Sequence, residues 1–173
     1  YLENINFKGK AITVASHFIL EGDTSYISKT IIDGSQHANP DSGTVVYFTN
    51  GETLRSILCG FTITGGSGTC NHIVFKDYAY YFGGGIFISA SGKIEYNKII
   101  NNAITPSLEY NYAGVGVGIC VWNATWEDSE VIKNNTIDSV IIRNNTISNN
   151  SIIAGNEICA VEMEKTEYVL FEG

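Results

Sequence analysis

The chain has 173 residues and a formal net charge of −8, which is enough for one domain with its own apolar core. The acidic balance disfavours nucleic acid as a partner, because such binding needs a basic face, and no apolar run is long enough for a membrane-spanning helix. Isoleucine and valine far outnumber leucine, glycine and asparagine are abundant, and proline occurs only twice. Because β-branched residues favour strands and Gly and Asn favour tight turns, the composition predicts an all-β fold.

In chain order, short strand-like segments alternate with turns rich in Gly and Asn. We assign them to about five coils of a β-solenoid, each holding two or three short strands. The first two coils are expected to contain residues 4–7, 11–15, 30–33, 44–48 and 56–64. The later coils are expected to begin at Gly83, Gly114 and Gly155, with third-coil strands at 85–89, 93–97 and 98–101.

Two motifs recur along the chain. Residues 97–102 return as 145–150, with a glycine-substituted relative at 61–66. A second motif at 84–87 returns at 117–120 and again at 156–159. Their irregular spacing excludes a strict short-period solenoid and favours coils with loops of variable length.

Alignment of these motifs predicts which side chains face the interior. We expect an aliphatic ladder formed by Val46, Ile86, Ile119 and Ile158. Because side chains alternate between the two faces of a strand, we also expect one parity of residues 57–63 to point inward. That set comprises Ile57, Cys59, Phe61 and Ile63.

Three segments carry a resemblance to a known family. Residues 1–16, 30–34 and 60–66 look like the first coils of secreted bacterial right-handed parallel β-helix repeat proteins, which belong to the pectate-lyase-like superfamily. The resemblance implies an all-β, right-handed parallel β-helix of about five coils with irregular loop inserts. It further implies a secreted, extracellular or cell-surface location. The length predicts one domain over residues 1–173, and the lack of evident end caps leads us to expect that it belongs to a longer chain or an assembly. The resemblance does not imply one activity, since many functions share this scaffold.

The catalytic signatures of the superfamily are missing from the sequence. Pectate lyases combine a calcium-binding carboxylate cluster with an arginine base, but Arg55 and Arg143 lie in separate repeats. Polygalacturonases use Asn-Thr-Asp and Gly-His-Gly, whereas this chain has Asn-Thr-Ile at Asn135 and Asn145. We therefore expect no catalytic residue and a non-catalytic extracellular scaffold, either a surface or adhesion module or a self-associating filament subunit. The alternative is a polysaccharide lyase or glycoside hydrolase of the same superfamily.

Aromatic residues gather in two inserts, residues 78–82 and 110–112, just before the third and fourth coils. Because the inserts enter equivalent points of consecutive coils, we expect both on the same edge of the solenoid. Planar rings stack on the apolar faces of sugars, and Tyr and Trp also offer a polar group. We therefore expect a polysaccharide or cell-surface glycan as a partner, although the rings could equally fold back over the sheet. The candidate glycan-binding residues are Tyr78, Tyr80, Tyr81, Tyr110, Tyr112, Trp122 and Trp126.

The densest carboxylate group is formed by Glu127, Asp128 and Glu130. Oxygen ligands at short range suit Ca²⁺, so calcium is the one cofactor we consider there, with a solvated turn as the alternative. Cys120 and Cys159 align in the second motif, and neighbouring strands lie about 4.8 Å apart. They are candidates for a disulfide between coils, or for two stacked free thiols. No capping helix is evident at either end, so self-association through the end coils is also expected.

Overall fold

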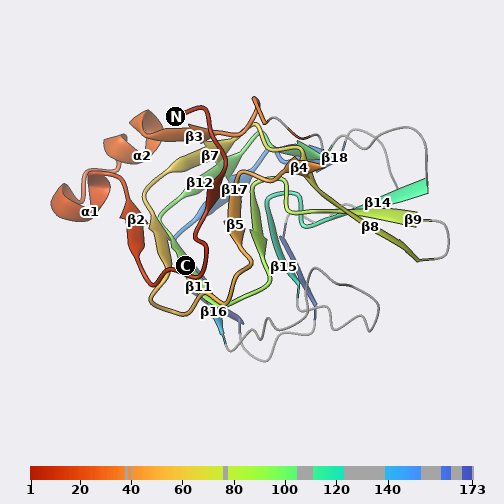
Figure 1. The fold of residues 1–173 in the computed structure, drawn as a ribbon. Coiled ribbons are helices and arrows are strands. Elements are labelled where there is room, and N and C mark those ends of the chain that lie inside the picture. Colours follow the sequence, from red (N-terminus) through yellow and green to blue (C-terminus); the bar gives the residue numbers. More distant parts are fainter. Residues whose placement is uncertain are drawn as a thin grey trace.

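The computed structural model describes residues 1–37, 39, 41–75, 78–104, 111–122, 139–152, 161–164 and 169–172. Most of its strands form three parallel sheets (Figure 1). Within each sheet, neighbouring strands come from successive coils. The arrangement is a parallel β-helix of about five coils, as the sequence predicts.

The first sheet consists of β1 (Ile5–Asn6), β5 (Val46–Phe48), β10 (Ile86–Ile88), β15 (Ile119–Trp122) and β19 (Val161–Glu164). The second consists of β2 (Thr13–Ala15), β6 (Ile57–Cys59), β11 (Gly92–Glu95), β16 (Val140–Arg143) and β20 (Val169–Glu172). The third consists of β3 (Ile31–Asp33), β7 (Thr62–Thr64), β12 (Lys98–Ile100) and β17 (Thr146–Ser148).

The remaining described elements decorate these three sheets. A side sheet of order β14-β9-β8-β4 projects from the solenoid (Figure 1). Its members are β4 (Ser42–Gly43), β8 (Gly68–Phe75), β9 (Tyr78–Phe82) and β14 (Asn111–Val115). A two-stranded pair is formed by β13 (Ala103–Ile104) and β18 (Ser151–Ile152). Two short helices, α1 (Phe18–Glu21) and α2 (Ser25–Lys29), lie between β2 and β3.

The helices were not evident from the sequence because four and five residues are too few to display a helical period. α2 is fixed by the burial of Ile27 and by a hydrogen bond from Thr62 Oγ1 to the Ile27 carbonyl oxygen (2.8 Å). No helix in the described ranges is long and apolar enough to span a membrane.

The interior is an aliphatic column contributed by successive coils. Val46, Ile86 and Ile119 are register partners, and each is 0% exposed. The prediction that Ile158 continues this ladder is wrong, because Val161 is the partner of Ile119. Val161 and Met163 lie two positions apart, as Ile119 and Val121 do, and both residues of each pair are larger than alanine. Ile158 is followed at that distance only by an alanine.

The side chains of the second coil that point into the core are also partly different from those expected. Phe61 and Ile63 belong to the core cluster, as predicted, but Leu58 occupies the inward position of β6 instead of Ile57 and Cys59. Gly60, between the two strands, has a φ of 81°. That left-handed conformation turns the chain at the corner and breaks the simple alternation.

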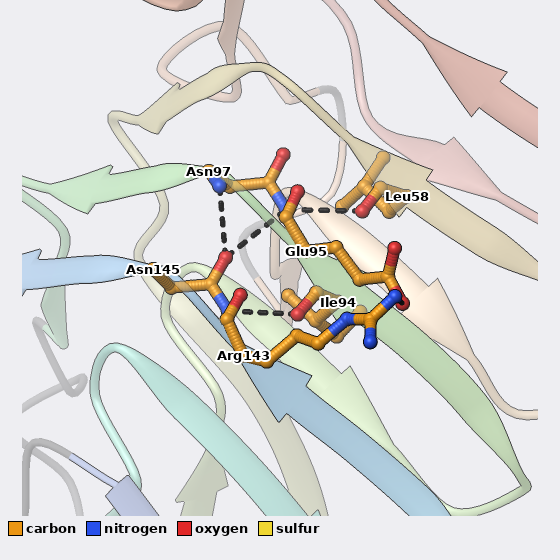
Figure 2. Close-up of polar contacts among 6 residues, drawn as sticks. All are labelled: Leu58, Ile94, Glu95, Asn97, Arg143 and Asn145. Carbon is orange, nitrogen blue, oxygen red and sulfur yellow. Dashed lines mark hydrogen bonds and ion pairs between the residues drawn. The ribbon is translucent and has the colours of Figure 1, made fainter. Parts of the chain in front are cut away.

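Asparagines at the corners link the coils from within. Asn97 is 2% exposed, and its side-chain Oδ1 accepts a hydrogen bond from the Phe61 amide in the coil below (3.0 Å). Its Nδ2 donates to the Leu58 carbonyl oxygen (3.0 Å), while Asn145 in the coil above accepts from the Asn97 amide (2.8 Å; Figure 2). Asn102 and Asn150 repeat this arrangement at the next corner. The repeated Asn motif therefore satisfies backbone groups that the turns would otherwise leave buried without partners.

Candidate functional site

The side sheet brings the two aromatic inserts of the sequence together. β9 and β14 pair in parallel, with Tyr80 opposite Ala113 and Phe82 opposite Val115. The inserts thus lie side by side on one edge of the solenoid, as predicted. The strands enter from consecutive coils, so their positions follow from the stacking of the coils themselves.

Where the side sheet meets the outer face of the first sheet, five aromatic side chains form one cluster, here called the aromatic surface. Its members are Tyr47, Tyr80, Phe82, Phe87 and Trp122. Tyr47 and Phe87 are register partners at outward positions of β5 and β10, between residues that point into the core. Cys120, the next position in that column, is fully buried against the same cluster.

Phe82 lies at the centre of the aromatic surface. Its ring stacks with Phe87 at a centroid distance of 5.5 Å and with Tyr80 at 6.3 Å, and it meets Trp122 at 5.1 Å in a tilted arrangement. Phe82 and Phe87 are buried, whereas Tyr47, Tyr80 and Trp122 are half-buried. Two buried rings therefore support three rings that retain access to solvent.

A chain of hydroxyl groups gives this apolar surface a polar end. Thr44 Oγ1 donates to the Phe82 carbonyl oxygen (3.1 Å), so it accepts from Thr69 Oγ1 (2.7 Å). Thr69 Oγ1 has thereby used its own hydrogen and must accept from the Tyr47 hydroxyl (2.8 Å). Because a hydroxyl has one hydrogen and two lone pairs, the Tyr47 oxygen keeps capacity to accept from a ligand hydroxyl.

Burial raises the pKa of Tyr47 above its ordinary value of 10.0. Tyr47 therefore remains a neutral phenol near neutral pH and holds its place in the hydroxyl chain. Neutral hydroxyls beside half-exposed rings are the chemistry that suits a sugar, whose ring has apolar faces and hydroxyl edges.

The other candidate glycan-binding residues occupy different places. Tyr81 is 5% exposed and packs with Ile104 and Val117 in a separate cluster, so it is not part of the aromatic surface. Tyr78 and Tyr112 lie in β9 and β14. Tyr110 and Trp126 lie outside the described residues.

Sequence reasoning missed Tyr47, Phe82 and Phe87 as members of the site. Phe82 stands in the first insert but was not singled out. Tyr47 lies between Val46 and Phe48, and Phe87 lies between Ile86 and Ile88. An aromatic residue between two core residues, repeated in consecutive coils, is the signal that would have placed both on the outer face.

The proposed metal ligands Glu127, Asp128 and Glu130 all lie outside the described residues, so calcium binding there stays a prediction. In the part of the chain that the structure describes, no three His, Cys, Asp or Glu residues gather as a metal site would need.

The disulfide prediction rested on an alignment that the structure corrects. The register partner of Cys120 is Glu162, three residues beyond Cys159. The short Ile-Cys match at 158–159 misled the alignment, because the apolar pair Val161 and Met163 sets the register instead. Cys159 itself lies outside the described residues, and its pairing with Cys120 stays a prediction.

Arg143, considered above as a catalytic base, is committed to an ion pair on the second sheet. Its Nη2 lies 2.9 Å from Glu95 Oε1 on the neighbouring coil (Figure 2). Cys59 is the register partner of Glu95 on the other side. Burial, followed by the charge of Glu95, raises the pKa of the Cys59 thiol, and Arg143 offsets part of this effect. A thiol with a raised pKa is a poor nucleophile at neutral pH. The Arg143–Glu95 ion pair joins two neighbouring coils.

Comparison of the chain with family models, with curated proteins and with solved structures finds no match.

Proposed function

We propose that the protein is a non-catalytic extracellular scaffold that binds polysaccharide or a cell-surface glycan through the aromatic surface. The observation that supports this proposal is the cluster itself, with Tyr47, Tyr80 and Trp122 half-exposed around the buried Phe82 and Phe87. Large rings held by a rigid sheet lose little conformational freedom on binding. The β-helix supplies that rigidity through its stacked coils.

The experiment compares Trp122→Ala and Tyr80→Ala with the parent protein, first on a glycan array and then by calorimetry with the polysaccharides that bind. Each substitution is expected to weaken binding about tenfold, which corresponds to ~1.4 kcal/mol. Tyr26→Ala is the matched control, because Tyr26 is also a half-buried tyrosine but lies on α2, away from the side sheet (Figure 1). Unchanged binding in both site variants would refute the role of this surface.

The non-catalytic part of the proposal has its own test. Release of reducing ends or of unsaturated sugars from a bound polysaccharide would contradict it and would favour the lyase or hydrolase alternative. The carboxylates that such an enzyme would draw on, at residues 127–130, lie outside the described residues.

Self-association through the end coils is the second candidate function. The first coil exposes several apolar side chains, with Leu2 61%, Ile12 45% and Ile31 40% exposed. Sedimentation velocity at increasing concentration tests this role. It predicts growing rods that Leu2→Lys shortens, whereas a monomer at every concentration would contradict it.

A further inference from the structure

The turn between β5 and β6 contains the chain's single Asn-Gly pair, Asn50 and Gly51. Both residues are exposed, and Gly51 has a φ of 77°. A Cβ placed on Gly51 would find no atom within 4 Å. The amide of Gly51 donates to no acceptor in the described part of the chain. An asparagine is therefore followed by the nitrogen of an exposed glycine that has no acceptor in the described part of the chain.

The side chain of Asn50 is held in a state that suits attack by that nitrogen. Thr49 Oγ1 donates a hydrogen bond to Asn50 Oδ1 (3.3 Å). This bond draws electron density from Cγ, while the amide nitrogen Nδ2 remains the group that leaves. The Asn50 main-chain amide is anchored separately, to Glu52 Oε2 (2.7 Å).

We propose that Asn50 is a site of spontaneous deamidation, with water as the only co-reactant. Hydroxide takes the proton of the Gly51 amide, and the nitrogen forms a bond to Asn50 Cγ. The Cγ–Nδ2 bond breaks, and ammonia leaves with a proton from water, which restores the hydroxide. The resulting five-membered imide takes up one water molecule at either of its two carbonyls. Opening at one carbonyl gives aspartate, and opening at the other gives isoaspartate.

The protein contains its own comparison for this chemistry. Asp33 and Gly34 form the related Asp-Gly pair, which reaches the same imide by loss of water. There the Gly34 amide is buried and donates to the Thr64 carbonyl oxygen (3.0 Å), and Asp33 Oδ1 accepts from the Ser35 amide (2.9 Å). Because the attacking nitrogen of Gly34 is buried and already hydrogen-bonded, this pair is protected in the folded state.

The modification changes a contact that joins the first three coils. Glu52 is 3% exposed, and its Oε1 accepts from the Gly9 amide of the first coil (2.9 Å). Its carbonyl oxygen accepts from the Ser91 amide of the third coil (3.1 Å). Either product places a second carboxylate next to Glu52, and isoaspartate also lengthens the main chain beside the anchored amide. The modified turn therefore weakens this contact between the first and second coils, slowly and irreversibly.

The test follows folded protein over weeks at constant pH and temperature by peptide mass spectrometry. The peptide containing Asn50 is expected to gain about one dalton and to separate into two isomers, while the peptide containing Asp33 stays unchanged. In urea-unfolded protein, both peptides are expected to react. Asn50→Gln is the control, because glutamine would have to close a less favourable six-membered ring, and it should show no gain over the same period.

Hydrogen exchange of the Gly9 amide tests the structural consequence. The amide is expected to exchange faster in the modified protein, and Asn50→Asp separates the effect of the added charge from that of the lengthened main chain. Retention of Asn50 in folded protein, while the unfolded protein reacts, would overturn the proposal, because the turn would then hold the reacting atoms apart.

Discussion

Replacement of Asn97 by alanine tests the asparagine ladder most sharply. Asn97→Ala removes the acceptor of the Phe61 amide and a donor to the Leu58 carbonyl oxygen, in a position that is 2% exposed. Each buried polar group left without a partner costs about 1–3 kcal/mol. Two such groups give a loss of roughly 2–6 kcal/mol, a large share of the ~5–15 kcal/mol that stabilises a typical domain.

Urea unfolding followed by circular dichroism measures this loss. The control is Asn101→Gly, because Asn101 is exposed with a φ of 56°, a conformation that glycine adopts without strain. The control should lie within about 0.5 kcal/mol of the parent protein. If Asn97→Ala also unfolded within that margin, at an unchanged dependence on urea, the ladder would not hold the coils together.

Three further predictions concern packing, charge and pH. Ile86→Ala should lower the free energy of unfolding in urea by about 2–5 kcal/mol, because the side chain is 0% exposed in the aliphatic column. A smaller loss would mean that the column is not tightly packed. Arg143→Met should lower the free energy of unfolding by about 1–3 kcal/mol, since it leaves the largely buried Glu95 without its ion pair. Glu95→Gln combined with Arg143→Met should recover part of this loss. If the effects of the two substitutions were simply additive, the two residues would not be coupled. Because burial raises the pKa of Cys59 and of Cys70 above 9.0, the folded state holds protons that the unfolded state has released. Stability should therefore be fully present below pH 9.0 and fall as pH rises above it, and an unchanged alkaline slope in Cys59→Ala combined with Cys70→Ala would contradict this assignment.

The sequence was sufficient to predict the architecture because one physical signal recurs in every coil. The motif at 97–102 and its copy at 145–150 fall into register as predicted, with Ile99 beside Ile147. Its glycine-substituted relative also aligns, with Ile63 beside Ile99. A repeated apolar residue at a fixed distance from a repeated turn carries this information without any tertiary detail.

The predicted strand register was wrong where the matching motif was short. The predicted inward-facing side chains were wrong where a corner of the coil interrupted the strand. The match of Ile158 to Ile119 rested on two residues, whereas the observed register pairs Val161 with Ile119 and Met163 with Val121. Alternation through residues 57–63 ignored Gly60, whose left-handed backbone resets the phase. Both errors arise because contacts with the adjacent coil decide the register of a strand and which of its side chains face inward.

The candidate site could be predicted only in part. The two aromatic inserts were expected on one edge, and β9 and β14 do lie there. Tyr47 and Phe87 were missed because only the inward-facing residues of their strands were considered, and each of the two lies between such residues. The asparagines were taken for turn residues, whereas Asn97 and Asn102 also bond backbone groups of the neighbouring coils. That role depends on which groups the stacking buries, and a single sequence does not reveal this.

The central claim is that successive coils stack in parallel and in register, and a disulfide measures it directly. Lys98 and Thr146 are register partners on the third sheet, where adjacent strands about 4.8 Å apart allow a disulfide to form. In the double variant Lys98→Cys with Thr146→Cys, mass spectrometry after mild oxidation should find peptides 98 and 146 linked. Lys98→Cys with Ser148→Cys, two residues out of register, should link far more slowly. Equal or faster linkage in the second variant would contradict the parallel stack.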